Sequence, residues 1–194
     1  MALWGASDAD ESKPKNLTTA EKKEVFATAS GWVREAGSTL SGNGNVNADP
    51  EVLVAISGLA VSIGAADVTE VEWITTEADK SAGFTLSIRV RYNEAVTVTG
   101  SPTLAVTNGN QGSGSGRGPH TLVYASGTGT NELVFSLAIA AANAATNAND
   151  VLVVGAQNIA LAGGTLKDKG TSTNSAVAIS AGQGTACGSV TVVA

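Results

Sequence analysis

The sequence of 194 residues contains 17 acidic and 11 basic residues, which give a formal net charge of −6. This balance argues against duplex nucleic acid as a partner, because phosphate contacts require a basic surface. The chain is 43% hydrophobic but only 4% aromatic, and it holds 23 glycines. Small and β-branched apolar residues combined with many turn formers favour stacked β-sheets over a helical bundle.

The segment 1–30 differs in character from the rest of the chain and is predicted to form an anchoring arm. Leu3 and Trp4 make an apolar tip ahead of a polar stretch. Lys13, Pro14 and Lys15 follow, and this part is expected to be extended because the residue before a proline is disfavoured in a helix. Tryptophan is enriched at interface hot spots, which favours an arm that buries its tip on a neighbour. The alternative is a flexible terminus without an anchoring role.

A short helix is predicted within this arm. Thr18 or Thr19 can cap its start, and Glu21 stands in the first turn with Lys22 after it. A threonine followed by a glutamate in the first turn is a helix-start pattern. We expect the helix to continue through Phe26.

The N-terminus carries acidic residues where a secretory signal peptide would have a basic and an apolar region. Cys187 is the only cysteine, so no disulfide can form within the chain. No apolar run approaches the length that spans a membrane. We therefore expect a protein made without export and without a membrane partner.

The segment 31–66 is predicted to form a small β-module. Gly31–Arg34 and the run 51–56 are β-rich and are expected to pair as a hairpin, with Trp32 covering the second strand. The connection between them, 37–50, is rich in glycine, asparagine and serine, and loops of this length are usually functional or mobile. The run 59–63 alternates in a β-like way, so a further strand is predicted there.

The segment 67–194 is predicted to form an antiparallel β-sandwich. The organising stretch is 84–107, in which Leu86, Ile88 and Val90 alternate with polar residues, as in a strand with one buried face. Asn93 and Glu94 are expected to break this run into two strands. The most clearly predicted pair flanks the turn at 126–130. The strands expected are 68–74, 84–92, 95–98, 103–107, 120–125, 131–139, 151–154, 158–161, 163–168, 177–179 and 189–193.

Catalytic and cofactor sites are not predicted. His120 is the only histidine and Cys187 the only cysteine, so one chain cannot assemble a histidine or thiolate metal site. No serine elbow accompanies His120 for nucleophilic catalysis. The glycine-rich loop at 109–118 lacks the Lys-Ser/Thr ending of a phosphate loop. We therefore expect a protein that is not an enzyme and holds no cofactor.

Calcium is the one metal weighed for this chain. Acidic side chains stand near predicted strand ends, where β-sandwich domains can bind calcium, but calcium needs six or more converging oxygens and no acid-dense loop is present. No metal is therefore predicted. The residues considered are Asp67, Glu70, Asp150 and Asp168.

Three blocks of the C-terminal part carry a resemblance to a known family. They are the blocks 90–104, 124–135 and 161–168, in that order and with matching spacing. In these blocks the region from 67 to 194 resembles the bacterial Ig-like repeats of large surface adhesins. The resemblance implies an Ig-like antiparallel β-sandwich and little about function, because such sandwiches host many roles.

The region from 1 to 60 carries a second resemblance, through the blocks 1–5, 12–15, 31–33 and 50–56. It resembles the N-terminal segment of virion structural proteins of tailed marine phages, in particular cyanophages with contractile tails. In those proteins the segment precedes variable β-sandwich modules. This resemblance implies a component of a virion, assembled in the host cytoplasm.

Together these features predict a non-enzymatic phage virion protein, in particular a capsid decoration protein. Its expected partners are the major capsid protein, other virion subunits and its own copies, and no nucleic acid. Two alternatives remain: a tail, neck or fibre component, or an Ig-like module that binds a carbohydrate on the host surface. The residues predicted to contact a partner are Leu3, Trp4, Lys13, Pro14, Lys15 and Trp32.

Overall fold

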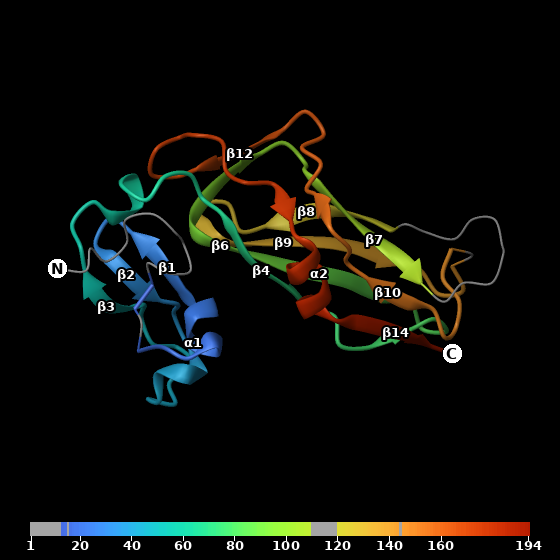
Figure 1. Cartoon of the computed structure of the whole chain (residues 1–194). Helices are drawn as coiled ribbons and strands as arrows, with labels where there is room; N and C mark the ends of the chain where they lie inside the picture. Colours follow the sequence, from blue (N-terminus) through green and yellow to red (C-terminus); the bar gives the residue numbers. More distant parts are fainter. Residues whose placement is uncertain (1–12, 15, 110–119, 144) are drawn as a thin grey trace.

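The computed structural model describes residues 13–14, 16–109, 120–143 and 145–194 (Figure 1). The described part of the chain is mostly β, with 46% of its residues in strands and 11% in helices. A large sheet of 12 strands and a small sheet of two strands account for the strands named below. The large sheet is mixed, since β1 runs parallel to β6 and β5 parallel to β14. The antiparallel arrangement predicted for 67–194 therefore holds for the strand pairs described there except β5–β14.

Described residues 16–63 form what we call the N-terminal module, which lies at one end of the long strands (Figure 1). It contains helix α1 (Thr19–Lys23), strands β1 (Val25–Thr28), β2 (Gly31–Arg34) and β3 (Glu51–Ala55), and the 3-10 turns η1 (Thr39–Ser41) and η2 (Leu59–Val61). The predicted hairpin is confirmed, because β2 pairs antiparallel with β3. β1 lies within the segment assigned to the arm and pairs antiparallel with β2.

Two local predictions in this module have different outcomes. The helix start is confirmed: the Thr18 hydroxyl accepts from the Glu21 amide, and the Glu21 carboxylate accepts from the Thr18 amide at 2.8 Å. The helix ends at Lys23 rather than Phe26, because β-branched Val25 begins strand β1. The strand predicted at 59–63 is wrong. Left-handed Gly58 starts a 3-10 turn there instead.

Strand β6 (Phe84–Thr99) is the longest element and the centre of the large sheet. It pairs with β4 (Val68–Trp73), β9 (Thr130–Ile139) and β12 (Thr165–Asp168), and with β1 at Ala27 opposite Glu94. The predicted break at Asn93 and Glu94 is wrong. The strand instead carries a bulge, seen as a register shift against β9 between Arg91 and Val96. Asn93 is retained there because its Oδ1 accepts from the Asp67 amide at 2.7 Å.

The remaining strands complete the sheet in the order β9, β8, β7, β10, β14 and β5. The predicted β8–β9 pair is confirmed, as is the C-terminal strand that fixes the chain end in the sheet. Helix α2 was not predicted. The bounds are β5 Ala78–Asp79, β7 Thr103–Gly109, β8 His120–Ser126, β10 Val151–Val153, β11 Gln157–Asn158, β13 Ala178–Ile179, α2 Ala181–Cys187 and β14 Ser189–Val193.

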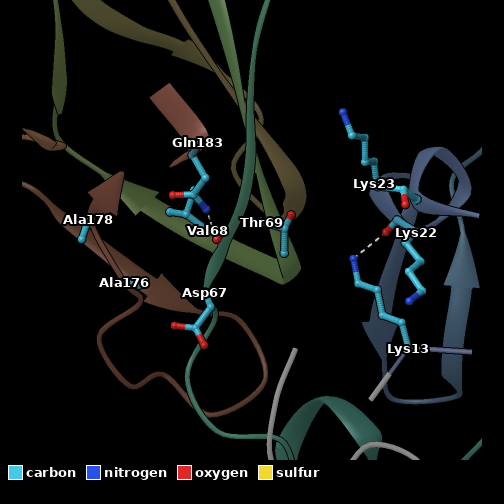
Figure 2. Close-up of a pocket in the computed structure, with 10 residues that line it drawn as sticks. Lys13, Lys22, Lys23, Asp67, Val68, Thr69, Ala176, Ala178 and Gln183 are labelled. Carbon is cyan, nitrogen blue, oxygen red and sulfur yellow. Dashed lines mark hydrogen bonds between the residues drawn. The ribbon is translucent and has the colours of Figure 1, made fainter. Parts of the chain in front are cut away.

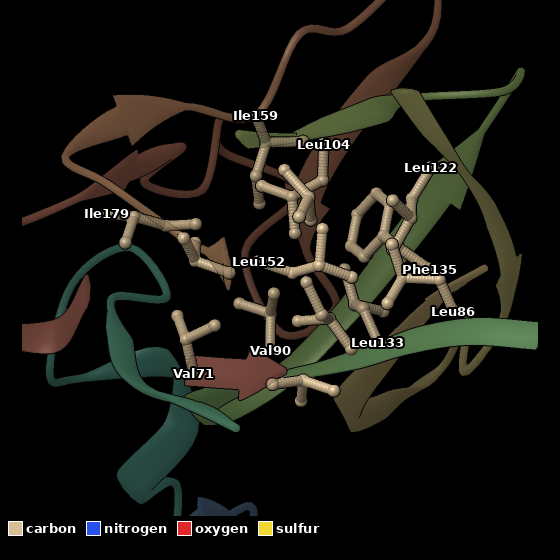
Figure 3. Packing of buried hydrophobic residues seen from close by; sticks show 14 of the residues in the cluster. Val71, Leu86, Val90, Leu104, Leu122, Leu133, Phe135, Leu152, Ile159 and Ile179 are labelled. Atoms are coloured by element: carbon tan, nitrogen blue, oxygen red, sulfur yellow. The ribbon is translucent and has the colours of Figure 1, made fainter. Parts of the chain in front are cut away.

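Two clusters of apolar side chains form the interior. The larger cluster collects inward residues of β4 to β10 and of β12, β13 and β14. Figure 3 shows the part of it that comes from β4, β6, β7, β8, β9, β10 and β13. The alternation predicted for 84–92 is confirmed, since Leu86, Ile88 and Val90 are all fully buried. A smaller cluster belongs to the N-terminal module and contains Val25, Ala27, Trp32 and Leu59. Each part of the chain therefore has its own core.

Candidate binding cleft

A cleft of about 650 Å³ lies between the N-terminal module and the adjoining part of the large sheet (Figure 2). Three lysines and Thr19 line the side that belongs to the N-terminal region, and residues before and on β4, near β13 and on α2 line the other. The lining residues are Lys13, Thr19, Lys22, Lys23, Asp67, Val68, Thr69, Ala176, Ala178 and Gln183.

The lysine side of the cleft is held by contacts within the N-terminal region. The Lys13 side chain is 3% exposed, and its Nζ donates to the Lys22 carbonyl oxygen at 2.6 Å (Figure 2). This bond ties the chain ahead of α1 to the end of that helix. Lys23 forms an ion pair with Glu70 of β4. Two of the three ammonium groups are thus already positioned by protein groups.

The opposite side combines a fixed amide with an unused hydroxyl. Gln183 Nε2 donates to the Val68 carbonyl oxygen at 2.6 Å, while Gln183 Oε1 accepts from the Ser180 amide at 2.8 Å. Thr69 Oγ1 is buried and has no hydrogen-bond partner among the described residues. The cleft therefore has lysines on one side, and Asp67, the Gln183 amide and the buried Thr69 hydroxyl on the other.

A buried arginine fixes the N-terminal module against the sheet beside this cleft. The guanidinium of Arg91 contacts Glu35 at 2.7 Å, Glu132 at 2.9 Å and Glu72 at 3.3 Å. Its Nη1 also donates to the Lys23 carbonyl oxygen at 3.4 Å. The network joins β6, β9, β4 and the module, so it sets how the two sides of the cleft lie.

The electrostatics of this network follow from burial and opposite charge. Burial alone would lower the pKa of Arg91, but the carboxylates of Glu35, Glu132 and Glu72 outweigh it and raise the pKa. The pKa of Glu132 is raised, first by burial and then by the neighbouring Glu35. Arg91 is therefore the cation that keeps several acids together at this junction.

A second surface of the module is the outer edge of β3. Within the described part of the chain, β3 pairs only with β2. Val52 on this strand is 53% exposed, whereas Leu53 and Val54 pack on the module core. An edge strand with an exposed apolar side chain can receive a further strand.

The residues predicted to contact a partner lie in different parts of the structure. Lys13 lines the cleft, and Pro14 is buried with its carbonyl oxygen accepting from the Leu17 amide at 3.3 Å. Trp32 is fully buried in the module core, so its side chain does not reach the surface in this conformation. The predictions for Leu3, Trp4 and Lys15 lie outside the described residues.

The sequence interpretation missed the remaining cleft residues and the arginine network. A signal for the network was present: Glu70 and Glu72 alternate along one predicted strand, and Arg89 and Arg91 alternate along another. Charged residues of the same parity on two pairing strands face each other across the pair. No local pattern marks Glu35, which is 56 residues from Arg91 in the sequence.

The structure also shows where the candidate chemical groups lie. His120 Nε2 is 3.0 Å from Thr146 Oγ1, and burial lowers the His120 pKa while Asp150 opposes the shift. Thr146 is fully buried, so its hydroxyl is out of reach of a substrate. The acids weighed for calcium do not converge: in the described ranges, no three His, Cys, Asp or Glu side chains are placed to hold a metal ion.

The helices of the described residues are all too short or too polar to cross a membrane. Comparison of the chain with protein-family models, with curated proteins and with solved structures finds no match.

Proposed function

We propose that this protein is a non-enzymatic structural component of a phage virion, a capsid decoration protein that binds the shell through its N-terminal region. The observation that carries the proposal is the junction at Arg91. This buried network fixes the N-terminal module, with its cleft and its β3 edge, onto the large sheet.

We further infer that the segment 67–194 forms an Ig-like β-sandwich. Inward side chains of β6 and β9 share one buried cluster with those of β7 and β10 (Figure 3). Val190 and Val192 of β14 belong to the same cluster. A single core shared by strands that stand several positions apart in the order of one sheet is what two packed layers produce. The three sequence blocks that resemble adhesin repeats support the same fold.

The binding mode combines two surfaces of the module. The β3 edge can add a strand of a neighbouring subunit through backbone hydrogen bonds, with Val52 giving apolar contact. The lysine-lined cleft would receive an acidic stretch of the same subunit. A particle repeats each contact many times, so modest interfaces are sufficient.

A matched pair of variants tests the edge. Val52 of β3 and Val193 of β14 are both 53% exposed valines on strands. Val52→Lys should keep the fold and lose particle binding, because an edge lysine opposes strand addition. Val193→Lys should bind normally. Co-sedimentation of each purified variant with particles lacking this protein reports binding, and equal binding by both variants would remove the edge from the proposal.

The alternative of a host-glycan module has weaker support. Such binding needs an exposed aromatic platform, but Trp32 and Tyr92 are buried. The Trp73 indole donates to the Gly188 carbonyl oxygen at 3.3 Å, and Tyr124 packs edge-on against Phe135. Copy number on purified particles separates the remaining locations, since many copies per shell indicate decoration and few indicate a tail or fibre.

A further inference from the structure

A pair of carboxyl groups lies buried at the junction, apart from the arginine network. Glu94 of β6 and Asp168 of β12 are each 1% exposed, and their strands pair antiparallel. Asp168 stands opposite Val96 in this pairing, two residues from Glu94, and its carboxyl group is near enough to Glu94 to disfavour the ionisation of Glu94. When both groups are ionised, three of their four oxygens have no hydrogen-bond donor among the described residues. These are Oε1 and Oε2 of Glu94 and Oδ2 of Asp168.

The Asp168 carboxyl is oriented by the chain that follows it. Its Oδ1 accepts from the Gly170 amide at 2.5 Å and from the Thr171 amide at 2.9 Å. These two bonds leave only Oδ2 for Glu94. Donors to the pair are therefore lacking on one oxygen of Asp168 and on both oxygens of Glu94.

The charged groups around Glu94 are acidic. Asp168 of β12 and Asp67, which precedes β4, both disfavour its ionisation. From β1 the residue opposite Glu94 is Ala27, which has no charge. Lys169 follows Asp168, but its ammonium donates to the Gly129 carbonyl oxygen at 3.1 Å.

One proton satisfies this arrangement. A neutral Glu94 can donate its O–H to Asp168 Oδ2, which gives both groups a partner and removes one of two adjacent buried charges. Two carboxylates in contact cannot both ionise without a large penalty. The position matters, because Glu94 is the residue at which β1 of the module pairs with β6.

We propose that Glu94 and Asp168 form a proton-sharing carboxyl pair that closes the joint between the N-terminal module and the large sheet, and that loss of the shared proton to solvent opens this joint. Ionisation places two repelling carboxylates beside the single β1–β6 pairing. The module is then released first, while the rest of the sheet keeps its own core.

The pKa of Glu94 is raised, as expected for a buried carboxyl group beside a second one. Burial first, and then the neighbouring Asp168, raise its pKa to about 9 from an ordinary 4.5. A folded-state pKa above the unfolded value means that the folded protein holds the extra proton between these limits. The stabilisation is therefore complete below about pH 4.5 and is lost as the pH rises through about 9.

The test follows unfolding by urea between pH 7 and 9.5 for the wild type, Glu94→Gln and a control, Glu77→Gln, which changes an exposed acid. The folding constant of the wild type should fall by up to about tenfold per pH unit below pH 9. Glu94→Gln keeps the shape and a donor without a titrating proton, so it should show little dependence. Glu77→Gln should follow the wild type.

Two further measurements locate the effect. Protection of the backbone amides of 25–34 against hydrogen exchange, corrected for the intrinsic rise of exchange with pH, should fall in the wild type at a lower pH than protection of the β9 amides. Infrared spectra at pH 7 should contain the carbonyl stretch of a neutral carboxylic acid, absent in Glu94→Gln and altered in Asp168→Asn. The infrared spectrum of the wild type tests the proposal even if a variant fails to fold.

Four outcomes would overturn the proposal. The first three are a wild-type folding constant that does not change between pH 7 and 9, a Glu94→Gln variant whose folding constant falls as steeply as that of the wild type, and a missing neutral-acid band. A fourth is stabilisation of the wild type but not of Glu94→Gln by millimolar Ca²⁺, which would make the pair a metal site instead.

Discussion

Replacing Arg91 by methionine should destabilise the protein strongly, because it removes the cation from a junction that gathers carboxylates. The Arg91 side chain is 7% exposed, and it contacts Glu35 at 2.7 Å and Glu132 at 2.9 Å. Removing one member of a buried ion pair typically costs about 3–5 kcal/mol, since the partner charges stay behind without compensation. The carboxylates here retain some exposure, 16% for Glu35 and 28% for Glu132, so we expect about 3 kcal/mol.

Arg89 provides the matched control on the same strand. Its side chain is 31% exposed and pairs with Glu72 at 2.7 Å. An ion pair with this much solvent contact contributes about 1 kcal/mol or less, so Arg89→Met should cost far less than Arg91→Met. The measurement is the free energy of unfolding from urea denaturation at pH 7 for both variants.

The double variant Arg91→Met/Glu35→Gln identifies the cause. If unpaired carboxylates produce the loss, removing the nearest one should recover part of it. Equal costs for Arg91→Met and Arg89→Met, or no recovery in the double variant, would refute the assignment of the junction to Arg91.

Phe135→Ala should cost about 3–5 kcal/mol in urea unfolding, because Phe135 is fully buried in the larger core, whereas Val123→Ala at a 41% exposed site of β8 should stay within about 0.5 kcal/mol. His120 is expected to affect the stability of the fold at acidic pH. Its pKa is lowered, so its contribution to stability is present above about pH 6.5 and is lost as the pH falls; thermal unfolding at pH 7.5 and pH 5 should show a smaller acid loss for His120→Asn than for the wild type. An unchanged acid loss in His120→Asn would contradict this.

The strand content of this chain was predictable because its strands carry their own alternation. Leu86, Ile88 and Val90 recur with period two, and the same residues fill the core. The start of α1 was predictable for a similar local reason, since Thr18 and Glu21 form a capping box with each other. In each case the interactions that decide the structure lie within a few residues.

Helix α2 shows why other elements were not predictable. It contains Gly182 and Gly184, and glycine is a poor helix former. Gly184 is required by packing instead: a Cβ at this position would lie 2.5 Å from the Val154 carbonyl oxygen. A close approach between segments that are distant in the chain leaves no local trace in the sequence. The run that begins at Leu59 shows the opposite case. Its sequence has a β-like pattern, but left-handed Gly58 turns the backbone into a 3-10 helix, so the strand predicted there does not form.

The joint between the module and the large sheet also depends on contacts distant in sequence. Two buried charged residues meet there, and they are surrounded by different groups. Arg91 and Glu94 both lie on β6, beside its bulge, and both are buried. Arg91 is compensated by acids from β4, β9 and the module, whereas the charged groups near Glu94 are the acids Asp168 and Asp67, which with burial raise its pKa. Both positions also meet the N-terminal module, Arg91 through Glu35 and Glu94 through the pairing with Ala27. Two of the contacts that attach the module therefore lie beside one bulge, in addition to the Lys23–Glu70 ion pair to β4, so a change of charge at Arg91 or Glu94 should loosen the module while the β6–β9 core stays folded.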